Sequence, residues 1–356
     1  MNAARETRGS RAGFVWSAFA LAAVAVIAIV AVRRGGLLDL PPVSDRVTAE
    51  TAGLSNLDQL ARRAAQLDAA GSGTSDAARV GTSDAAGPGT SDSALIAAST
   101  GLKAVRDGEV ERGLDSLRHA LRLAPSDLVL GNAYRMTVLR LRRAALNDAS
   151  ARATLAGRLP PAIEREPIAF LETLRREHPG REVSLQLALA WVDELMLFPA
   201  LEIKAPASVE SVALLSGILE QEPAYVPALF GRGLNYLHRP ARLVWPESKK
   251  MAPDAASRDL AQCVAIGRKI GGGSPRLVGT LALTLGDAYA REGHLETARS
   301  WWQIAQNTGA DAGLSAAARR RFTWDDREVP DRLEQELETR MSDLDHPLSD
   351  LAILWQ

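Results

Sequence analysis

The sequence predicts an all-α protein, with a membrane-spanning helix at the start, then a low-complexity linker, then an array of helix pairs. Three observations point to this class. Aromatic residues make up only 5% of the 356 residues, so the chain is poor in side chains that strands prefer. An uncharged apolar run fills residues 14–32. From residue 94 onward, apolar residues recur at the spacing of amphipathic helices.

The apolar run, which follows a short tail at 1–13, predicts a transmembrane signal anchor over 14–32. It reads FVWSAFALAAVAVIAIVAV, and at ~1.5 Å per residue a helix of this length nearly matches the ~30 Å hydrocarbon core of a bilayer. One alternative is a cleaved signal peptide, but the run exceeds the usual ~7–15 apolar residues and no small-x-small cleavage site follows it. The other alternative, a buried core helix, lacks a packing partner in the linker that follows.

Arginines flank the run evenly, so the positive-inside rule gives a tie. Three precede it and three follow it: Arg5, Arg8 and Arg11, then Arg33, Arg34 and Arg46. Because a short N-terminus usually stays in the cytoplasm, we expect a single-pass protein of the inner (cytoplasmic) membrane of a bacterium, with its C-terminal domain periplasmic.

Charge and cysteine content exclude some classes of function. Outside residues 1–34, the chain has 37 basic and 42 acidic residues. This balance argues against a nucleic-acid partner, which would need a basic surface. The single cysteine, Cys263, excludes an intrachain disulfide and a cysteine-based zinc cluster.

Residues 33–93 are predicted to form a flexible linker, interrupted by a short amphipathic helix at 54–70. The letters GTSD occur three times at a spacing of eight, beginning at Gly73, Gly81 and Gly89. A calcium-binding repeat is the alternative, but it would need several carboxylates per turn and each copy supplies one. We therefore expect a duplicated spacer that holds the helical domain off the bilayer.

Residues 94–323 contain the repeat pattern that predicts the fold. Small residues recur where two helices would cross in SALIAASTGLKAVRDGEVERGLDSLRHALRLAPSD, and again at the same offsets in LTLGDAYAREGHLETARSWWQIAQNTGA. A third copy is split by an insertion within HRPARLVWPESKKMAPD, around Trp245. The residues that carry the pattern in each copy are, in the first copy, Gly101, Gly108, Gly113, Leu117, Ala120 and Pro125; in the second, Leu285, Gly286, Tyr289, Gly293, Ala298, Trp302 and Ala305; and in the split copy, Leu229, Gly233, Tyr236, Ala256, Leu260 and Cys263.

These copies resemble the 34-residue tetratricopeptide repeat. The resemblance implies an α-solenoid of roughly five helix pairs, three of them well matched. Residues 126–221 match poorly, but they read as second helices ending at Pro179 and Pro223, with a first helix, LQLALAWVDELM, between them. The resemblance also places Cys263 at a small core position, so we expect a structural thiol rather than a nucleophile.

Residues 324–356 are predicted to cap the array. The segment DRLEQELETRMSDL places Leu333, Leu337, Met341 and Leu344 on one stripe, as a capping helix requires. The last residues, LSDLAILWQ, are apolar for a chain end. Two expectations stay open for them: folding back onto the last repeat, or docking on a partner.

No motif for catalysis, cofactor binding or metal binding is present in the sequence. The five histidines are scattered, and HExxH and G-x-S-x-G are absent. The run IGRKIGGGSP differs from a phosphate loop because its lysine precedes the glycines. The acidic run TWDDRE reads as a solvated turn. We therefore predict a protein that is not an enzyme and that binds no cofactor or metal.

Two functional hypotheses remain. The first is a membrane-tethered scaffold that binds a protein or peptide partner in the concave face of the solenoid. The second is an accessory or assembly factor for an envelope or cytochrome-type enzyme complex, acting through the insertion around Trp245. For the first hypothesis, the resemblance places the following side chains in the groove: Arg106, Phe230, Leu234, Asp287 and Arg291.

Overall fold

The computed structural model describes nine stretches of the chain: residues 40–55, 57–72, 90–147, 166–197, 201–239, 254–271, 273–309, 311–342 and 349–355. All regular structure in these stretches is helical, with thirteen α-helices and one 3-10 helix, so the all-α prediction is confirmed for them. None of these helices is both long enough and apolar enough to span a bilayer. The predicted anchor at 14–32, residues 73–89 of the GTSD segment and residues 240–253 around Trp245 lie outside the described residues.

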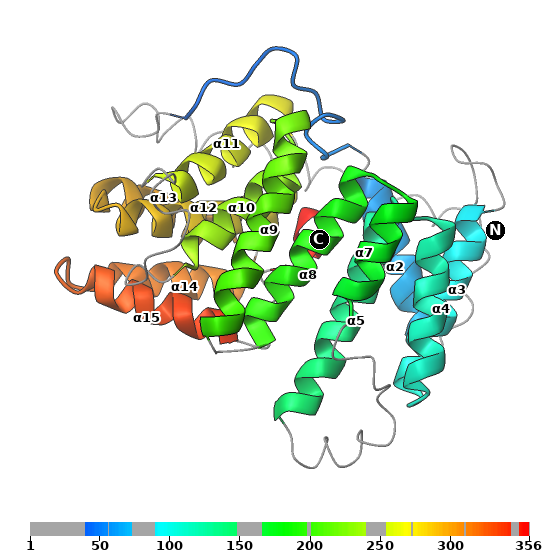
Figure 1. Cartoon of the computed structure of the whole chain (residues 1–356). Helices are drawn as coiled ribbons and strands as arrows, with labels where there is room; N and C mark the ends of the chain where they lie inside the picture. The colour runs from blue at the N-terminus through cyan, green and yellow to red at the C-terminus, as the bar shows by residue number, and fades with distance from the viewer. Residues whose placement is uncertain are drawn as a thin grey trace, which may run out of the picture.

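The helices follow one another along the chain as an array (Figure 1). The first seven are α2 (Leu57–Ser72), α3 (Thr90–Arg106), α4 (Val110–Leu123), α5 (Leu128–Asn147), α7 (Ile168–Glu177), α8 (Arg181–Leu197) and α9 (Leu201–Gln221). The others are α10 (Val226–Leu237), α11 (Ala255–Ile270), α12 (Pro275–Arg291), α13 (Leu295–Asn307), α14 (Ala312–Phe322), α15 (Val329–Ser342) and the 3-10 helix η3 (Leu351–Leu354). Successive helices pack as pairs, α3 with α4, α8 with α9, α10 with α11 and α12 with α13.

Glycines bring the predicted pairs into close contact. A Cβ atom on Gly101 would lie 2.7 Å from the carbonyl oxygen of Gly113, so α3 and α4 touch backbone to backbone. Between them, Gly108 adopts a φ of +88°, which side chains other than hydrogen strongly disfavour. In the α12–α13 pair, a Cβ on Gly286 would lie 2.5 Å from the Trp302 indole. These are positions that the repeat pattern singles out.

The poorly matched region also forms the helices that its pattern predicts. Helix α7 ends at Glu177, just before Pro179, and α9 ends at Gln221, just before Pro223. Helix α8 contains the predicted segment LQLALAWVDELM and packs against α9. The prolines end these helices because they cannot continue the hydrogen-bond ladder.

The described part of the predicted linker is packed on the helical body instead of hanging free. Helix α2 confirms the predicted short helix, and it lies against α3 and α5. Ahead of it, the main-chain carbonyl of Ala52 accepts a hydrogen bond of 3.0 Å from the amide of Val226, and Lys269 donates to the carbonyl of Ser44 at 2.6 Å. Ala52 and Leu54 are buried. Residues 73–89 therefore join two helices that touch each other.

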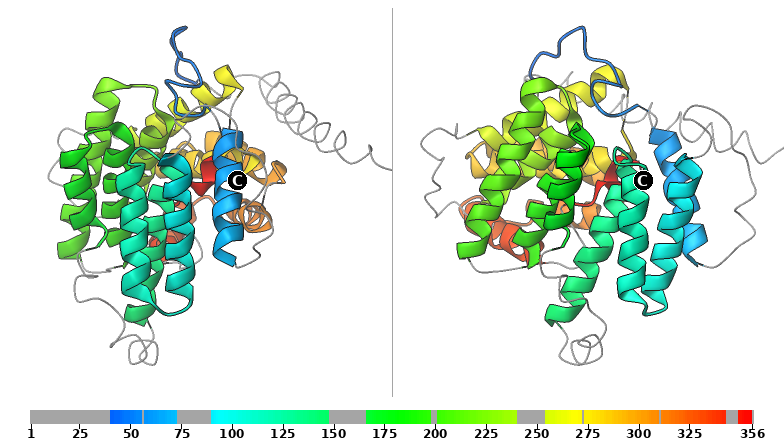
Figure 2. Two further views of the ribbon diagram at one scale, coloured as in Figure 1. Left: turned by 90° about the vertical axis from the view of Figure 1, so that its right-hand side faces the viewer. Right: turned by 45° about the vertical axis from the view of Figure 1, so that its right-hand side comes forward.

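Helices α5, α8, α10 and α12 lie side by side as a layer on which the C-terminal segment packs. Helix α8 contacts α5 and α10, and α10 contacts α12. Helix α15 packs on α8 and α12, while η3 packs on α5 and α12. We call the side of this layer that α15 and η3 cover the inner face. In both views of Figure 2 the red C-terminal segment lies within the array. Leu333 and Leu337, from the predicted capping stripe of α15, are buried.

Candidate functional site

The five side chains predicted to line a partner groove do not form one surface. Phe230 and Leu234 of α10 are 6% and 5% exposed, and Asp287 of α12 is fully buried. These three have almost no surface to offer a partner. Arg106 is exposed at the end of α3, and Arg291 is half-buried at the end of α12. For Phe230, Leu234 and Asp287 the structure shows core positions rather than an open groove, and the binding of a partner stays a prediction.

Asp287 belongs to a buried ion pair. Its carboxylate accepts hydrogen bonds from Arg321 of α14 at 2.5 Å and 2.7 Å, and a third from the indole nitrogen of Trp302 at 2.8 Å. Both partners of the ion pair are fully buried. Asp287 thus joins α12, α13 and α14, and its role is structural.

Arg291 joins α12 to two other helices. It donates a hydrogen bond of 2.6 Å to the main-chain carbonyl of Arg239, just after α10, and another to the carbonyl of Leu237, the last residue of α10. Its guanidinium lies 3.2 Å from the carboxylate of Glu334 on α15. Burial lowers the pKa of Arg291, and Glu334 opposes that shift. The contacts of Arg291 fix helices rather than present a charge.

The strongest candidate site is where the body binds residues 349–355, which we call the tail. The tail folds back, as one of the two expectations held: it lies on α12 of the last repeat copy and also on the more distant helix α5. It is almost fully enclosed. The buried tail residues are Ser349, Leu351, Ala352, Leu354 and Trp355.

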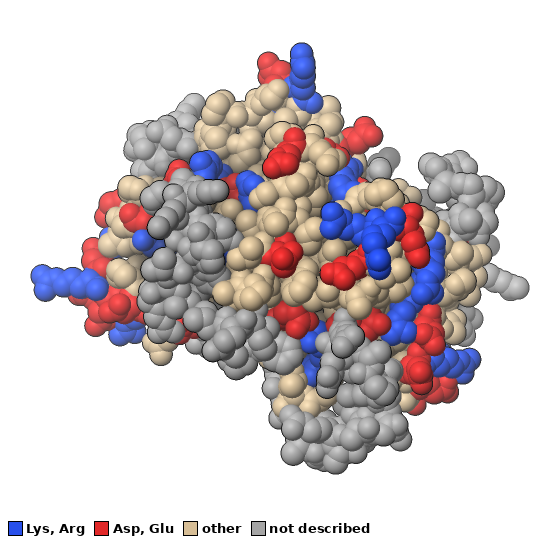
Figure 3. Space-filling model, viewed as in Figure 1, with Lys and Arg blue, Asp and Glu red and all other residues tan. Residues whose placement is uncertain are grey.

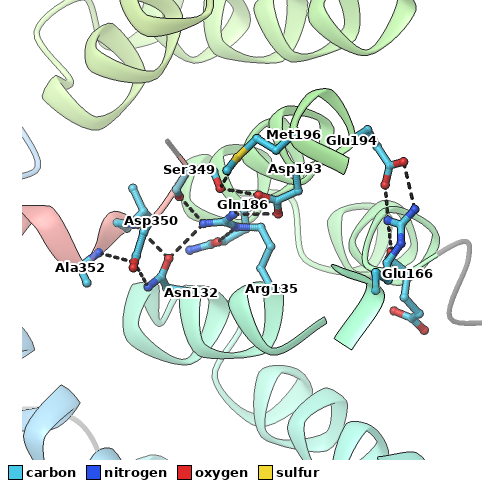
Figure 4. A network of polar contacts seen from close by, with 12 residues as sticks. Asn132, Arg135, Glu166, Gln186, Asp193, Glu194, Met196, Ser349, Asp350 and Ala352 are labelled. Carbon is cyan, nitrogen blue, oxygen red and sulfur yellow. Dashed lines mark hydrogen bonds and ion pairs between the residues drawn. The ribbon is translucent and has the colours of Figure 1, made fainter. Parts of the chain in front are cut away.

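Arg135 of α5 is the centre of this site (Figure 4). It is fully buried, and its guanidinium binds both carboxylate oxygens of Asp193 at 2.8 Å and 2.9 Å. The same guanidinium donates hydrogen bonds to the side-chain oxygens of Gln186 of α8 at 3.2 Å and Asn132 of α5 at 3.0 Å. It also donates to the main-chain carbonyl of Ser349. The guanidinium therefore joins α5, α8 and the tail.

Asn132 binds the tail through both atoms of its amide group. Its oxygen accepts the main-chain N–H of Leu351 at 3.0 Å, and its nitrogen donates to the Asp350 carboxylate at 2.7 Å. Asn132 and Arg135 are three residues apart on α5, so they lie on the same face of that helix. Just before α12, the Ser274 hydroxyl donates a hydrogen bond of 2.7 Å to the main-chain carbonyl of Ile353. We call Asn132, Arg135, Asp193 and Ser274 the tail seat.

Asp193 is enclosed between α5, α8 and the tail. It accepts from Arg135 and from the Ser349 hydroxyl, and it is 1% exposed. Burial raises the pKa of the Asp193 carboxyl above its ordinary value, while Arg135 and Ser349 act in the opposite direction. The charged form of the buried Asp193 carboxyl thus depends on the Arg135 guanidinium that binds it.

A second buried polar cluster lies beside the seat (Figure 4). Arg142 of α5 pairs with Glu194 of α8 and donates 2.8 Å to the main-chain carbonyl of Glu166. The Glu166 carboxylate in turn binds Arg118 of α4 at 2.6 Å and accepts from the Tyr134 hydroxyl. This cluster ties α4, α5 and α8 together, so it holds the helix that carries Asn132 and Arg135.

The described residues include no group of three or more His, Cys, Asp or Glu side chains able to hold a metal ion. Cys263 is buried, as predicted, and its sulfur lies 3.8 Å from the carbonyl of Val226. Burial, with a smaller effect of Asp259, raises the pKa of this thiol well above its ordinary value. A thiol in this environment is a poor nucleophile. On the face shown in Figure 3, basic and acidic side chains are interspersed.

Neither protein-family models nor curated proteins give a match to this chain.

Proposed function

We propose that this chain is a non-catalytic scaffold that binds a segment of a partner protein on the inner face of its helical array. The observation that carries the proposal is the seating of the tail. Asn132, Arg135 and Ser274 each bind a main-chain amide or carbonyl of the tail. Hydrogen bonds to main-chain groups bind a polypeptide segment whatever its side chains are, and apolar pockets for the side chains add selectivity.

The resemblance to tetratricopeptide repeats supports the proposal. In such solenoids the stacked helix pairs form an extended surface for protein partners. The observed pairs α3–α4, α10–α11 and α12–α13 coincide with the three best-matched copies. The α-solenoid, the repeat family and the protein partner are parts of this proposal. The assembly-factor alternative depends on the insertion around Trp245, which lies outside the described residues.

We further propose that the scaffold is held at the inner membrane of a bacterium by residues 14–32, with its body on the periplasmic side. Because residues 40–55 pack on α10 and α11, only residues 33–39 separate the anchor from the body. Seven residues reach about 25 Å at most when fully extended. The length of the GTSD segment therefore does not set the distance from the membrane, which changes the role expected for that repeat.

A photo-crosslinking experiment tests the proposed function. The full-length chain, in membranes of its source cell, carries a photoreactive amino acid at Ser274 in one variant and at Gly217 in the other. Ser274 touches the tail, whereas a Cβ on Gly217 of α9 would meet no atom within 4 Å. Replacing Ser274 removes its bond to Ile353, which is one of the contacts that hold the tail on the inner face. We expect one discrete protein adduct from position 274 and none from position 217.

The experiment has two contradicting outcomes. If position 274 gave no intermolecular adduct, the inner face would not bind a partner. If both positions gave the same adducts, the labelling would reflect proximity in the membrane rather than binding on this face.

A further inference from the structure

The tail is bound as a ligand would be. Its amide at Leu351 reaches a side chain 219 positions earlier, and its carbonyl at Ile353 reaches one 79 positions earlier. The regular structure of the tail is a single four-residue 3-10 helix, Leu351–Leu354, with Asp350 accepting from the amide of Ala352 at 2.9 Å. A segment this short has no core of its own, so its order depends on the seat.

We propose that the tail seat is an exchangeable binding site, and that the chain's own tail is a resident occupant that a partner segment must displace. This inference rests on the proposed function and names the regulation and the ligand of the same site. The ligand is a partner-protein segment that carries a serine-aspartate turn followed by leucine, a small residue, one further residue and a leucine-aromatic pair. The tail then acts as an autoinhibitory contact.

Each part of that ligand pattern follows from a contact. The buried Asp193 carboxylate accepts a hydroxyl hydrogen bond, which the Ser349 side chain supplies. Asn132 donates to an acidic side chain and accepts the next amide, which requires an Asp-type turn. Leu354 is fully buried, and Trp355 is 8% exposed, so the end of the ligand must be apolar and large.

The side chains of the seat also bind one another and the body. Within the body, Arg135 binds Asp193, Gln186 and Asn132, so these side chains keep partners when the tail leaves. The resident tail also fits imperfectly, because the buried indole nitrogen of Trp355 has no hydrogen-bond partner among the described residues. A ligand that supplies an acceptor at this point would bind better than the tail does.

A tethered occupant competes through its high local concentration. A segment joined by a short connection has an effective concentration of roughly millimolar. A free ligand with the same intrinsic affinity as the tail must exceed this concentration to occupy the seat, so its apparent affinity for the intact chain is weakened. Weakening the tail should release the seat.

Fluorescence anisotropy with a dye-labelled peptide of sequence SDLAILW tests this inference. The peptide is titrated with the full-length chain in detergent, with the full-length variant Leu354→Ala/Trp355→Ala, and with that variant carrying Ser274→Ala or Asn132→Ala. We expect at least about tenfold tighter binding to the tail-weakened variant than to the wild type. Adding Asn132→Ala should abolish binding and Ser274→Ala should weaken it. A scrambled peptide should not bind.

Equal affinity for the wild-type and tail-weakened chains, or no binding to either, would overturn the inference. Cooperative thermal unfolding of each variant shows whether the fold is intact. Ser274→Ala also removes the hydrogen bond by which the Ser274 hydroxyl caps α12 at the amide of Leu277, so its unfolding is compared directly with that of the wild type. A wild-type dimer that the peptide dissociates would also overturn it, since the occupant would then be the tail of a second copy. Failure here together with a discrete adduct at position 274 would leave the proposed function standing.

Discussion

Replacing Asp287 with alanine is expected to lower the free energy of unfolding by about 3 kcal/mol, because it leaves the buried Arg321 guanidinium with Glu336, at 3.2 Å, as its remaining counter-charge. Arg321 is fully buried and donates twice to Asp287. The substitution also removes the acceptor of the Trp302 indole N–H. Urea unfolding followed by far-UV circular dichroism gives the measurement.

The matched control is Asp326→Ala, another Asp–Arg pair but a mostly exposed one. The carboxylate of Asp326 pairs with Arg299 and is 59% exposed. Surface pairs contribute only ~0–1 kcal/mol, so this variant should unfold nearly as the wild type does. If both substitutions had the same small effect, the buried ion pair between α12 and α14 would be contradicted. A charge reversal at Asp287 would therefore report on folding and not on a partner groove.

Replacing Arg135 with methionine is expected to cost a similar ~3–5 kcal/mol, since it leaves the Asp193 carboxylate buried and unpaired. The double variant Arg135→Met/Asp193→Leu should recover a large part of this loss, because an apolar pair of similar volume carries no buried charge. Urea unfolding of the wild type, both single variants and the double variant measures the coupling. No recovery in the double variant would contradict a direct ion pair between these two residues.

The Arg135→Met variant should also depend on pH in a defined direction. In the folded wild type, burial already raises the pKa of Asp193 above its unfolded value of ~3.9, and loss of Arg135 removes the main group that opposes this shift. A carboxyl whose folded pKa is raised is stabilising in its protonated form, so stability falls as the pH rises from the unfolded pKa through the folded one. The deficit of the variant should therefore be small near pH 4 and larger at neutral pH. A deficit that did not change with pH would contradict a buried carboxylate.

The helix pairs could be predicted because their signals are local. Gly108 lies in the turn of one predicted pair and Gly293 in another, both with positive φ, and Pro179 follows the end of α7. Each of these depends on residues close by in the sequence. A glycine in a turn or a proline after a helix has a direct conformational cause that needs no knowledge of the rest of the fold.

The packing of residues 40–55 could not be predicted, because its contacts are with residues far away in the sequence. Gly53 adopts a positive φ and lies against the ring of Tyr225, where a Cβ would come within 2.3 Å of a ring carbon. Lys269 binds the carbonyls of Val43 and Ser44. These contacts join distant parts of the chain, and the segment itself has too few apolar residues to indicate burial.

Only one part of the candidate site could be predicted from the sequence. The apolar character of the last residues indicates that they are buried, but their position on α5 and α12 depends on how all the helices pack. The resemblance implies an open groove at Asp287, whereas Arg321 of α14 binds this carboxylate and α15 packs on α12 in this chain. A signal for the seat was present: Asp193 interrupts the apolar segment LQLALAWVDELM, and a buried carboxylate requires a partner such as Arg135.

The tail occupies the inner face of the folded chain, and amide hydrogen exchange of residues 350–355 in the full-length protein reports on this contact. The N–H of Leu351 donates to Asn132, and that of Trp355 donates to the carbonyl of Ala352. We expect these amides to be protected in the wild type and to exchange faster in Asn132→Ala, while amides of α12 stay protected in both. Exchange of the wild-type tail at the rate of an unstructured peptide would contradict the claim.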